Sequence, residues 1–241
     1  MKNVSGYIFV PVFLVSLLAS WLIWNNSPEY IKQGGPLLIL GLTSLFLVVT
    51  FGIERTLVLW RAGGRSGAHA FVAGLRKSLA GGDVAGALAS CQAQGGCLGN
   101  VIGAGLSTWQ ALSGGGTDRK EMLAETRRAI EEASALETPL LERNLSALST
   151  IASIATLLGL LGTTIGMIRS FRAMSHAGSP DAVQLALGIS EALVNTALGL
   201  ITAIIGIVLH NYFSTRVENV GSSMEEAAFE VLTILRDKKG A

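Results

Sequence analysis

A glutamate and an asparagine lie inside a segment that is otherwise apolar. Glu191 and Asn195 fall in residues 182–212, which have the length and composition of a membrane helix. The two side chains share a helix face, because they are four residues apart. Insertion scales assign about 2.5–3.5 kcal/mol to a charged residue at the centre of a membrane helix, so this carboxyl needs a partner, neutralisation or a function. A proton or ion pathway and a structural hydrogen bond are both open interpretations.

Small and polar residues continue this face along the segment. They recur in steps of three and four, which indicates one side of a helix: Gly188, Glu191, Asn195, Gly199, Thr202 and Gly206. Residues 145–168 carry a comparable, mostly polar stripe that comprises Ser149, Ser153, Thr156, Leu160, Thr163 and Met167. Two such stripes joined by a short hairpin can line a pore or a helix-filled lumen only if several copies assemble.

Glycines form a second pattern on the same two segments. They comprise Gly159, Gly162 and Gly166 on the earlier segment and Gly188, Gly199 and Gly206 on the later one. Small residues let membrane helices approach closely, so we expect these six positions to serve helix packing.

The elements that position these residues are predicted to be membrane helices. Half of the 241 residues are hydrophobic, only 15% are charged, and the mean hydropathy is +0.51. Four apolar stretches reach the roughly 18–20 residues needed to cross a bilayer: residues 7–24, 36–60, 145–168 and 182–213. The first has a signal peptide as its alternative, but no small-x-small cleavage site follows it, so we expect a retained spanning or interfacial helix. The composition therefore predicts an all-α, polytopic membrane protein.

Basic residues predict the orientation of these helices. Residues 61–143 hold nine lysines and arginines and the tail from residue 214 holds four, whereas residues 25–35 hold one and residues 169–181 hold two. Because cytoplasmic segments carry the excess of basic residues, the loop 61–143 and both termini are predicted to lie in the cytoplasm.

The sequence predicts five regions. They are two N-terminal membrane helices (1–60), a cytoplasmic helical loop (61–117), a long helix with the third span (118–172), a periplasmic hairpin (173–181), and a fourth span continued by a cytoplasmic C-terminal helix (182–241). Glycine pairs divide the cytoplasmic loop into short amphipathic helices, the first with Phe71, Val72, Leu75 and Leu79 on its apolar face. Pro139 is predicted to kink the long helix where it approaches the membrane.

Several other classes of protein find no support. A net charge of +1 gives no case for nucleic-acid binding, and the chain contains no phosphate-binding loop, HExxH or GxSxG motif. Cys91 and Cys97 have no histidine near them in sequence, so they predict neither a metal site nor a disulfide framework. We expect neither an enzyme nor a bound cofactor.

Three stretches resemble one family of membrane proteins. LLGLLGTTIGMIRSF (157–171), PDAVQLALGISEALVNTALGLITAI (180–204) and GGDVAGALASCQAQGG (81–96) are similar to the ExbB branch of the MotA/TolQ/ExbB proton-channel family. The likeness covers about residues 36–235, and its LGT-x-IG and GISEAL-x-TA-x-GL patterns fall on the predicted third and fourth spans. The N-terminus departs from the family pattern, because ExbB-like chains often have three spans and residues 7–24 add a fourth.

The resemblance implies a function and a set of partners. In that family the subunit forms a pentamer around an ExbD-type single-span partner, and proton flow drives motion that a TonB-type protein delivers to outer-membrane transporters. Thr163 and Thr196 match the family's pore-lining threonines and Glu191 its membrane glutamate, while Asn195 shares the face of Glu191. A TolQ-like or flagellar-stator-like subunit is the alternative within the family, and a non-conducting membrane scaffold is the alternative outside it.

Overall fold

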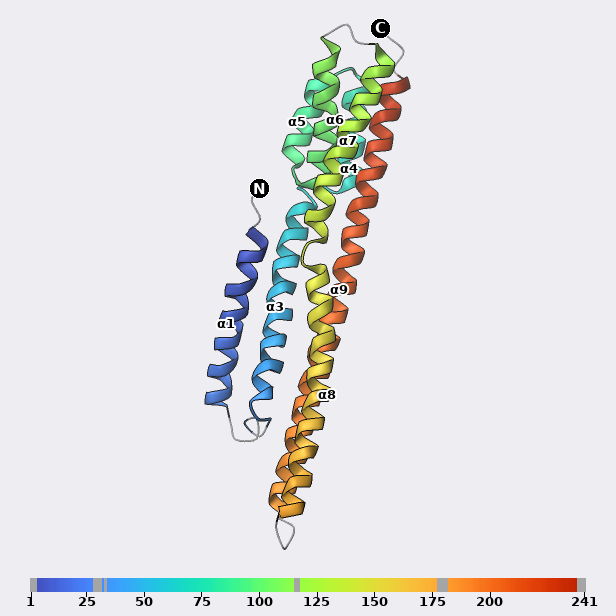
Figure 1. Ribbon diagram of the computed structural model, residues 1–241. Helices are drawn as coiled ribbons and strands as arrows, with labels where there is room; N and C mark the ends of the chain where they lie inside the picture. Colours follow the sequence, from blue (N-terminus) through green and yellow to red (C-terminus); the bar gives the residue numbers. More distant parts are fainter. Residues whose placement is uncertain (1–3, 28–31, 33, 115–117, 177–181, 238–241) are drawn as a thin grey trace. The chain divides into compact units, whose positions relative to one another are not determined.

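The structure is a computed structural model that describes residues 4–27, 32, 34–114, 118–176 and 182–237. Regular secondary structure in these ranges is entirely α-helical (Figure 1). Three runs are long and apolar enough to cross a membrane: Leu37–Ala62, Arg119–Ser175 and Ala182–Asp237. The predicted all-α, polytopic membrane fold is confirmed.

The chain divides into two compact units, each of which combines segments distant in sequence. Unit 1 consists of residues 1–54 and 144–212, and unit 2 of residues 55–143 and 213–241. Two helices run through both ranges, α3 (Leu37–Ala62) and α9 (Ala182–Asp237).

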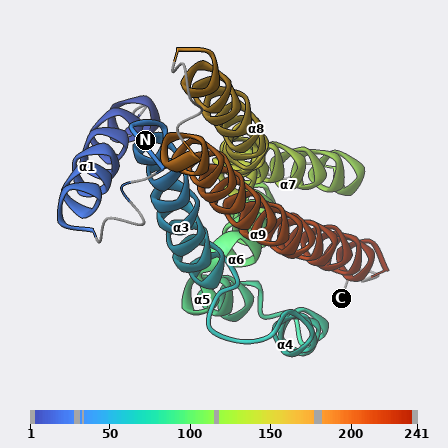
Figure 2. The ribbon, with the colours of Figure 1, turned by 90° about the horizontal axis from the view of Figure 1, so that it is seen from below.

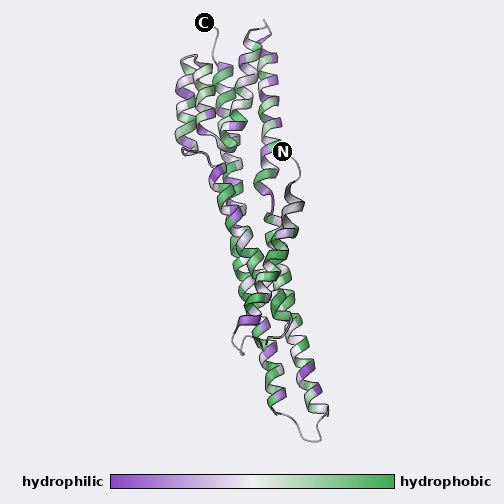
Figure 3. Ribbon diagram, turned by 90° about the vertical axis from the view of Figure 1, so that its left-hand side faces the viewer, coloured by the Kyte–Doolittle hydropathy of each residue, from purple (hydrophilic) through white to green (hydrophobic). Residues whose placement is uncertain are grey.

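Unit 1 contains α1 (Val4–Asn26), most of α3, α8 (Leu145–His176) and the first part of α9. In this unit α3 lies between α1 and the pair formed by α8 and α9 (Figures 1 and 2). Hydrophobic residues cover much of these helices (Figure 3), and large apolar side chains such as Leu157, Leu193 and Ile204 point outward. An apolar exterior over small and polar buried residues is what a lipid environment permits.

The sequence predicts two alternative roles for α1, a membrane span or a helix that lies on the membrane surface. The helix comprises 23 residues, and its described side chains begin at Val10. Ser16 and Ser20 are buried, and the Ser20 hydroxyl donates to the Ser16 carbonyl within the helix. Whether α1 spans the membrane or lies on it stays a prediction.

The long helix predicted for residues 118–172 is interrupted, and not at its proline. α7 (Arg119–Glu142) accommodates Pro139 within its last turns, and α8 begins at Leu145. Between them Asn144 adopts φ 62°, a left-handed conformation that asparagine tolerates better than most residues. The break is therefore set by the backbone at Asn144, five residues after the expected site. The hairpin predicted at 173–181 lies mostly outside the described residues, since α8 continues to His176 and α9 begins at Ala182.

Unit 2 is built around four helices and the C-terminal part of α9. The helices are α4 (Ala68–Ala80), α5 (Val84–Gln94), α6 (Gly96–Ser113) and α7. The four residues predicted to form the apolar face of α4 are all buried. Val101, Ile102 and Leu106 of α6 are almost fully buried, as are Met224, Ala227 and Val231 of α9. Burial of large aliphatic side chains gives this unit the core of a water-soluble helical domain.

A buried arginine of unit 2 meets the end of α7. Arg55 is 1% exposed, and its Nη1 donates to the Leu141 carbonyl at 3.2 Å. Carbonyls in the last turn of a helix lack intrahelical partners, and a cation there also complements the helix dipole. Arg55 thus stabilises the C-terminus of α7, a role that its place near the end of a hydrophobic stretch did not reveal.

Candidate functional site

Glu191 forms an ion pair within unit 1. Its side chain on α9 is 7% exposed, and Nη1 of Arg169 on α8 lies 2.5 Å from both carboxylate oxygens. The Arg169 side chain is about half exposed. The sequence predicted that this carboxyl needs a partner, and the structure supplies one from the facing helix, 22 positions away along the chain.

The turn before α3 covers the Glu191 carboxylate. Gly35 has φ 68°, and a side chain at this position would overlap the carboxylate and come within 3.3 Å of Nη1 of Arg169. Asn195 fixes the same turn, since its Nδ2 donates to the Gly34 carbonyl at 2.8 Å and to the Glu191 carbonyl at 3.0 Å. Asn195 therefore holds this turn against α9, where Gly35 packs closely on the Glu191 carboxylate.

A hollow of about 470 Å³ opens beside the ion pair. Its lining comprises Lys32, Gly35, Arg169, Gln184, Leu187, Gly188 and Glu191. Two cationic side chains and one carboxylate thus lie around a space that water can enter, on the side of unit 1 where α8 ends and α9 begins.

The two candidate threonines have different surroundings. Thr196 is half-buried between α8 and α9, where its hydroxyl lies 3.0 Å from the Ala192 carbonyl and 3.1 Å from the Gly159 carbonyl of the facing helix. Thr163 is also half-buried, but its hydroxyl donates to the Leu160 carbonyl of its own helix at 2.7 Å. Thr196 therefore bridges two helices. Among the hydrogen bonds of the described residues, that of Thr163 stays within its own helix.

The glycines lie where the two backbones approach. A Cβ at Gly199 would come within 2.6 Å of the Ala155 carbonyl oxygen and 2.8 Å of the Gly159 Cα, and a Cβ at Gly166 would meet Gly188 and Ala192. The remaining predicted packing positions behave alike: Gly162 faces Asn195, Gly188 faces Ser170, and Gly206 faces Ala152 of α8 and Val48 of α3. This geometry supports the packing role for all six glycines.

The ion pair lies near one end of the apolar length. At the other end, Nδ1 of His210 lies 3.1 Å from the Leu145 carbonyl, and Asn144 donates to Glu54 at 3.2 Å. Glu191 and His210 are separated by about 28 Å along α9 at 1.5 Å per residue, close to the roughly 30 Å of a hydrocarbon core. Glu191 thus lies toward one end of the apolar length of α9 rather than at its centre, where the insertion cost of a charge is largest.

Two contributors to this site were missed in the sequence. Arg169 was counted only as a basic residue beside the hairpin, and the Gly34–Gly35 turn was not considered. The LGTTIGMIRSF motif does contain Arg169, and an arginine at the end of a predicted span near a membrane glutamate is a signal that could have found the pair.

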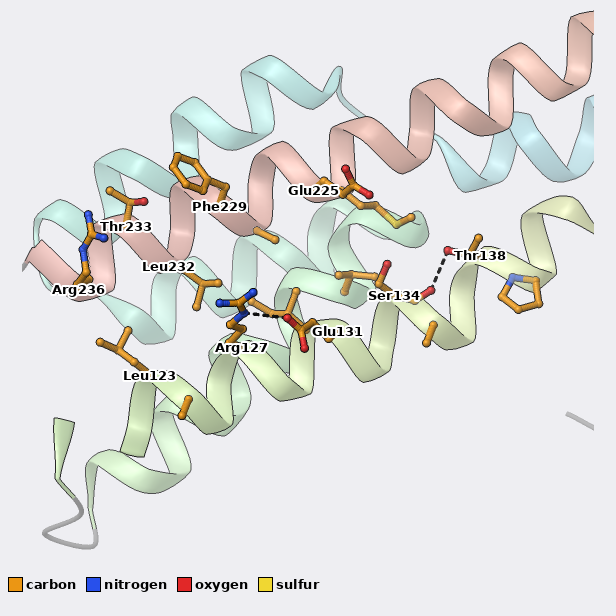
Figure 4. A pocket seen from close by; sticks show the side chains of 17 residues that line it. Leu123, Arg127, Glu131, Ser134, Thr138, Glu225, Phe229, Leu232, Thr233 and Arg236 are labelled. Atoms are coloured by element: carbon orange, nitrogen blue, oxygen red, sulfur yellow. Dashed lines mark hydrogen bonds and ion pairs between the residues drawn. The ribbon is translucent and has the colours of Figure 1, made fainter. Parts of the chain in front are cut away.

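Unit 2 holds a separate groove of about 1180 Å³ between α7 and the C-terminal part of α9 (Figure 4). Apolar side chains such as Leu123 and Leu232 line it, and Arg127 pairs with Glu131 along its side (Figure 4). Phe229 borders the groove and is 74% exposed. In the same unit Cys91 and Cys97 are buried free thiols, and the described residues contain no cluster of three or more potential metal ligands.

Comparison with known proteins finds one family whose model covers α8 and the first part of α9. The model of the MotA/TolQ/ExbB proton channel family matches residues 94–226. A biopolymer transport protein from a Synechocystis species, named ExbB-like 3, is 46% identical over 91 residues, which are 37% of this chain and 43% of that protein. TolQ of the Tol-Pal system of Pseudomonas aeruginosa is 34% identical over 123 residues, covering 51% and 53% of the two chains. The biopolymer transport protein ExbB of Salmonella typhimurium is 30% identical over 123 residues, covering 51% and 50%.

The family match spans more than half of the chain, including α8 and the first part of α9. The chain belongs to the MotA/TolQ/ExbB proton channel family. The matched stretches cover about half the length of these relatives, and both ExbB and TolQ proteins are among them.

Proposed function

We propose that this chain is an ExbB-like channel subunit that converts the proton motive force into mechanical work for TonB-dependent outer-membrane transport. The observation that carries the proposal is the family match across the α8–α9 pair, which contains Thr163, Glu191 and Thr196. One proton crossing 100 mV delivers roughly 2.3 kcal/mol, enough to bias a two-state arrangement of packed helices.

The proton pathway in this proposal uses four residues. Glu191 accepts and releases the proton, while Asn195 holds the turn that covers it. Thr163 and Thr196 solvate the proton through their hydroxyl groups deeper along α8 and α9. Support comes from the half-buried hydroxyls and from the hollow that gives water access to Glu191.

A homo-oligomer completes the pathway, and we propose a pentamer with an ExbD-like single-span partner in its central pore. Large apolar side chains exposed in a water-facing domain mark a protein contact. Leu136 and Phe229 are each 74% exposed in unit 2, and Phe229 borders the groove between α7 and α9. We assign this groove to a neighbouring copy of the chain, while the exposed apolar residues of unit 1 contact membrane lipid.

Native mass spectrometry in gentle detergent tests the assembly. A ring of several copies is expected for the wild type, and Phe229→Glu is expected to weaken it, whereas Glu226→Gln, at an exposed residue of the same helix that does not line the groove, is not. A monomeric wild type would contradict the proposed assembly.

The proposed orientation follows the distribution of basic residues, with residues 61–143 and the C-terminus in the cytoplasm of the bacterial inner membrane. A cysteine at the exposed position Ser113 should react with an impermeant maleimide only after the inner membrane is disrupted. Labelling in intact spheroplasts would reverse the topology.

A TolQ-like function is the second candidate, because the TolQ relative is at least as similar as the ExbB of Salmonella typhimurium. Expression in a strain that lacks its TonB-linked motor, and in one that lacks its Tol-Pal motor, distinguishes the two functions. Rescue of TonB-dependent nutrient uptake alone supports the ExbB-like function and its TonB-like partner, whereas rescue of the Tol-Pal phenotype alone supports the alternative.

A non-conducting scaffold is the third candidate, and the Arg169–Glu191 ion pair is the observation that favours it. Valine preserves the shape of threonine but lacks the hydroxyl, so Thr163→Val and Thr196→Val should abolish uptake while the complex still assembles. Thr→Ser at either position should be much milder. Thr164→Val is a matched control, because the Thr164 hydroxyl bonds the same Leu160 carbonyl as that of Thr163 but is exposed. Full activity in both valine variants would return the scaffold to first place.

A further inference from the structure

Glu191 contacts one charged side chain of the facing helix, that of Arg169. Arg169 belongs to α8, its Nη1 contacts both oxygens of the carboxylate, and its side chain also lines the hollow beside α9. A guanidinium group stays protonated at any pH that the protein meets, so it acts on Glu191 as a fixed positive charge.

The position of the carboxylate limits how a proton can reach it. The Gly34–Gly35 turn covers one side, and Gly35 approaches so closely that no side chain fits there. The Glu191 side chain is 7% exposed, whereas that of Arg169 is 51% exposed. Water therefore reaches the pair from the side of Arg169 and the hollow, and a proton arriving there meets the ion pair first.

The charges that face this carboxylate come from two elements. Arg169 projects from α8, and Lys32 lines the hollow from the segment before α3. The residues that α9 itself contributes to the hollow are Gln184, Leu187, Gly188 and Glu191, of which only Glu191 is ionisable. The surroundings within the described hollow thus favour the ionised carboxylate, and the nearer cation is the paired one.

We propose that Arg169 is a positioning residue that keeps Glu191 ionised and oriented until a proton replaces it. The inference rests on the proposed proton-channel function. In the step it describes, a proton from water in the hollow binds a Glu191 oxygen, the ion pair breaks, and Arg169 keeps its own proton and turns toward the hollow. Release of the proton toward Thr196 restores the carboxylate and lets the pair form again, so the pair opens and closes once for each proton.

A structural salt bridge predicts different behaviour from a pair that opens in each cycle. If the pair only joins α8 to α9, its loss reduces the amount of assembled complex, and the pH dependence of the remaining activity stays unchanged. If Arg169 holds the carboxylate ionised, its removal takes away the nearby positive charge that favours the charged form of a carboxyl group. The activity profile should then move to higher pH.

The experiment measures proton flux as a function of pH. The chain is purified together with its single-span partner and reconstituted into phospholipid vesicles, with a pH-sensitive dye inside. Arg169→Gln is expected to move the midpoint of the flux profile upward by about 1 unit or more. Arg169→Lys, which keeps the charge but loses the planar group, should assemble normally and shift the midpoint less in the same direction. If the complex of Arg169→Gln does not assemble, the shift of the flux midpoint in Arg169→Lys tests the proposal.

Arg172→Gln is the matched control. It removes the same charge from α8 one turn further on, at an exposed residue that does not line the hollow. Its profile is expected to coincide with that of the wild type, and an equal shift in this variant would assign the effect to surface potential and overturn the proposal.

A charge exchange gives an independent readout. The double variant Arg169→Glu with Glu191→Arg keeps an ion pair between the helices but moves the ionisable carboxylate to α8. We expect it to restore assembly and not flux. Wild-type flux in the exchanged variant, or unchanged midpoints in Arg169→Gln and Arg169→Lys, would overturn the positioning role. Absence of flux in the wild-type complex would instead refute the proposed function, so the two failures are distinguishable.

Discussion

The helix α9 makes two kinds of contact in its two units. In unit 1 it meets α8 through glycines and hydroxyl groups, with backbone atoms of the two helices in direct contact at Gly159 and Gly199. In unit 2 the same helix buries larger apolar residues, among them Val217, Met224 and Val231. The difference follows from the solvent: apolar residues gain little from leaving lipid for a protein contact, so close packing and hydrogen bonds join the helices there, whereas removal of apolar surface from water stabilises unit 2.

The largest effect is expected when a large side chain replaces a glycine at the contact between α8 and α9. Gly199→Leu places a side chain against the Ala155 carbonyl oxygen and Gly159 backbone, neither of which can move without separating the helices. We expect loss of the assembled complex, measured by size-exclusion chromatography of the detergent-solubilised protein. Gly221→Leu on the same helix is the control, since a Cβ at Gly221 has no atom within 4 Å. Normal assembly of Gly199→Leu would show that close backbone contact is dispensable.

A substitution that creates a cavity in the core of unit 2 should produce the next largest effect. Leu106 of α6 is 0% exposed, and its replacement by alanine removes buried aliphatic volume. Such substitutions cost about 2–5 kcal/mol. Thermal unfolding followed by circular dichroism should show a lower midpoint for Leu106→Ala and little change for Gln110→Ala, which alters an exposed residue of the same helix. Equal midpoints would contradict the assignment of a hydrophobic core to this unit.

Gly105 of unit 2 tests whether the two units differ in how rigidly their helices pack. A Cβ at Gly105 would overlap Cγ1 of Ile130 and come within 2.7 Å of its Cδ1, so the clash is with a side chain rather than with the backbone. Gly105→Ala should therefore cost about 1–3 kcal/mol, as overpacked positions do, and the complex should still assemble. Its thermal midpoint is expected to fall less than that of Leu106→Ala, and the reverse order would indicate that α6 and α7 pack as rigidly as α8 and α9.

The smallest effect concerns the thiols of unit 2. Burial raises the pKa of Cys91 to about 11, and burial together with the hydrogen bond and negative charge of Glu137 raises the pKa of Cys97 to about 12. Iodoacetamide at pH 8 should label them slowly in the native protein and quickly in SDS, because the thiolate is the reactive form. Above about pH 9 the unfolded chain releases thiol protons that the folded chain retains, so stability should fall as pH rises. Rapid native labelling at pH 8 would contradict this burial.

Much of the fold could be predicted, because the spacing of apolar residues and the composition of a segment are both properties of the local sequence. The apolar face of α4 was recognised from spacing alone, and the packing role of the six glycines stays a prediction. The interruption at Asn144 was not, because Pro139 was the more conspicuous helix breaker. A proline in the last turns of a helix disturbs few hydrogen bonds, whereas a left-handed residue ends the helix outright.

The candidate site was predictable one helix at a time. Glu191 and Asn195 stood out because they are polar residues on an apolar helix. Their partners did not, since the Arg169 contact depends on the relative rotation of two helices, and the Gly34 carbonyl lies 161 positions from Asn195. Interactions between distant segments have no signature in the spacing of either segment.

The glycine contact also leaves one degree of freedom undetermined. Small residues recur every three or four positions on both helices (Gly159, Gly162 and Gly166 on α8; Gly188, Ala192, Thr196 and Gly199 on α9), so a slide of α8 along α9 by one turn would again bring small residue against small residue. The glycines thus specify how near the two helices come, but they do not specify the register. The unique contacts specify it: Arg169 meets Glu191, and Thr196 meets the Gly159 carbonyl. Alignment of the two helices therefore depends on a few polar atoms, and in the proposed proton step Arg169 and Glu191 would release each other.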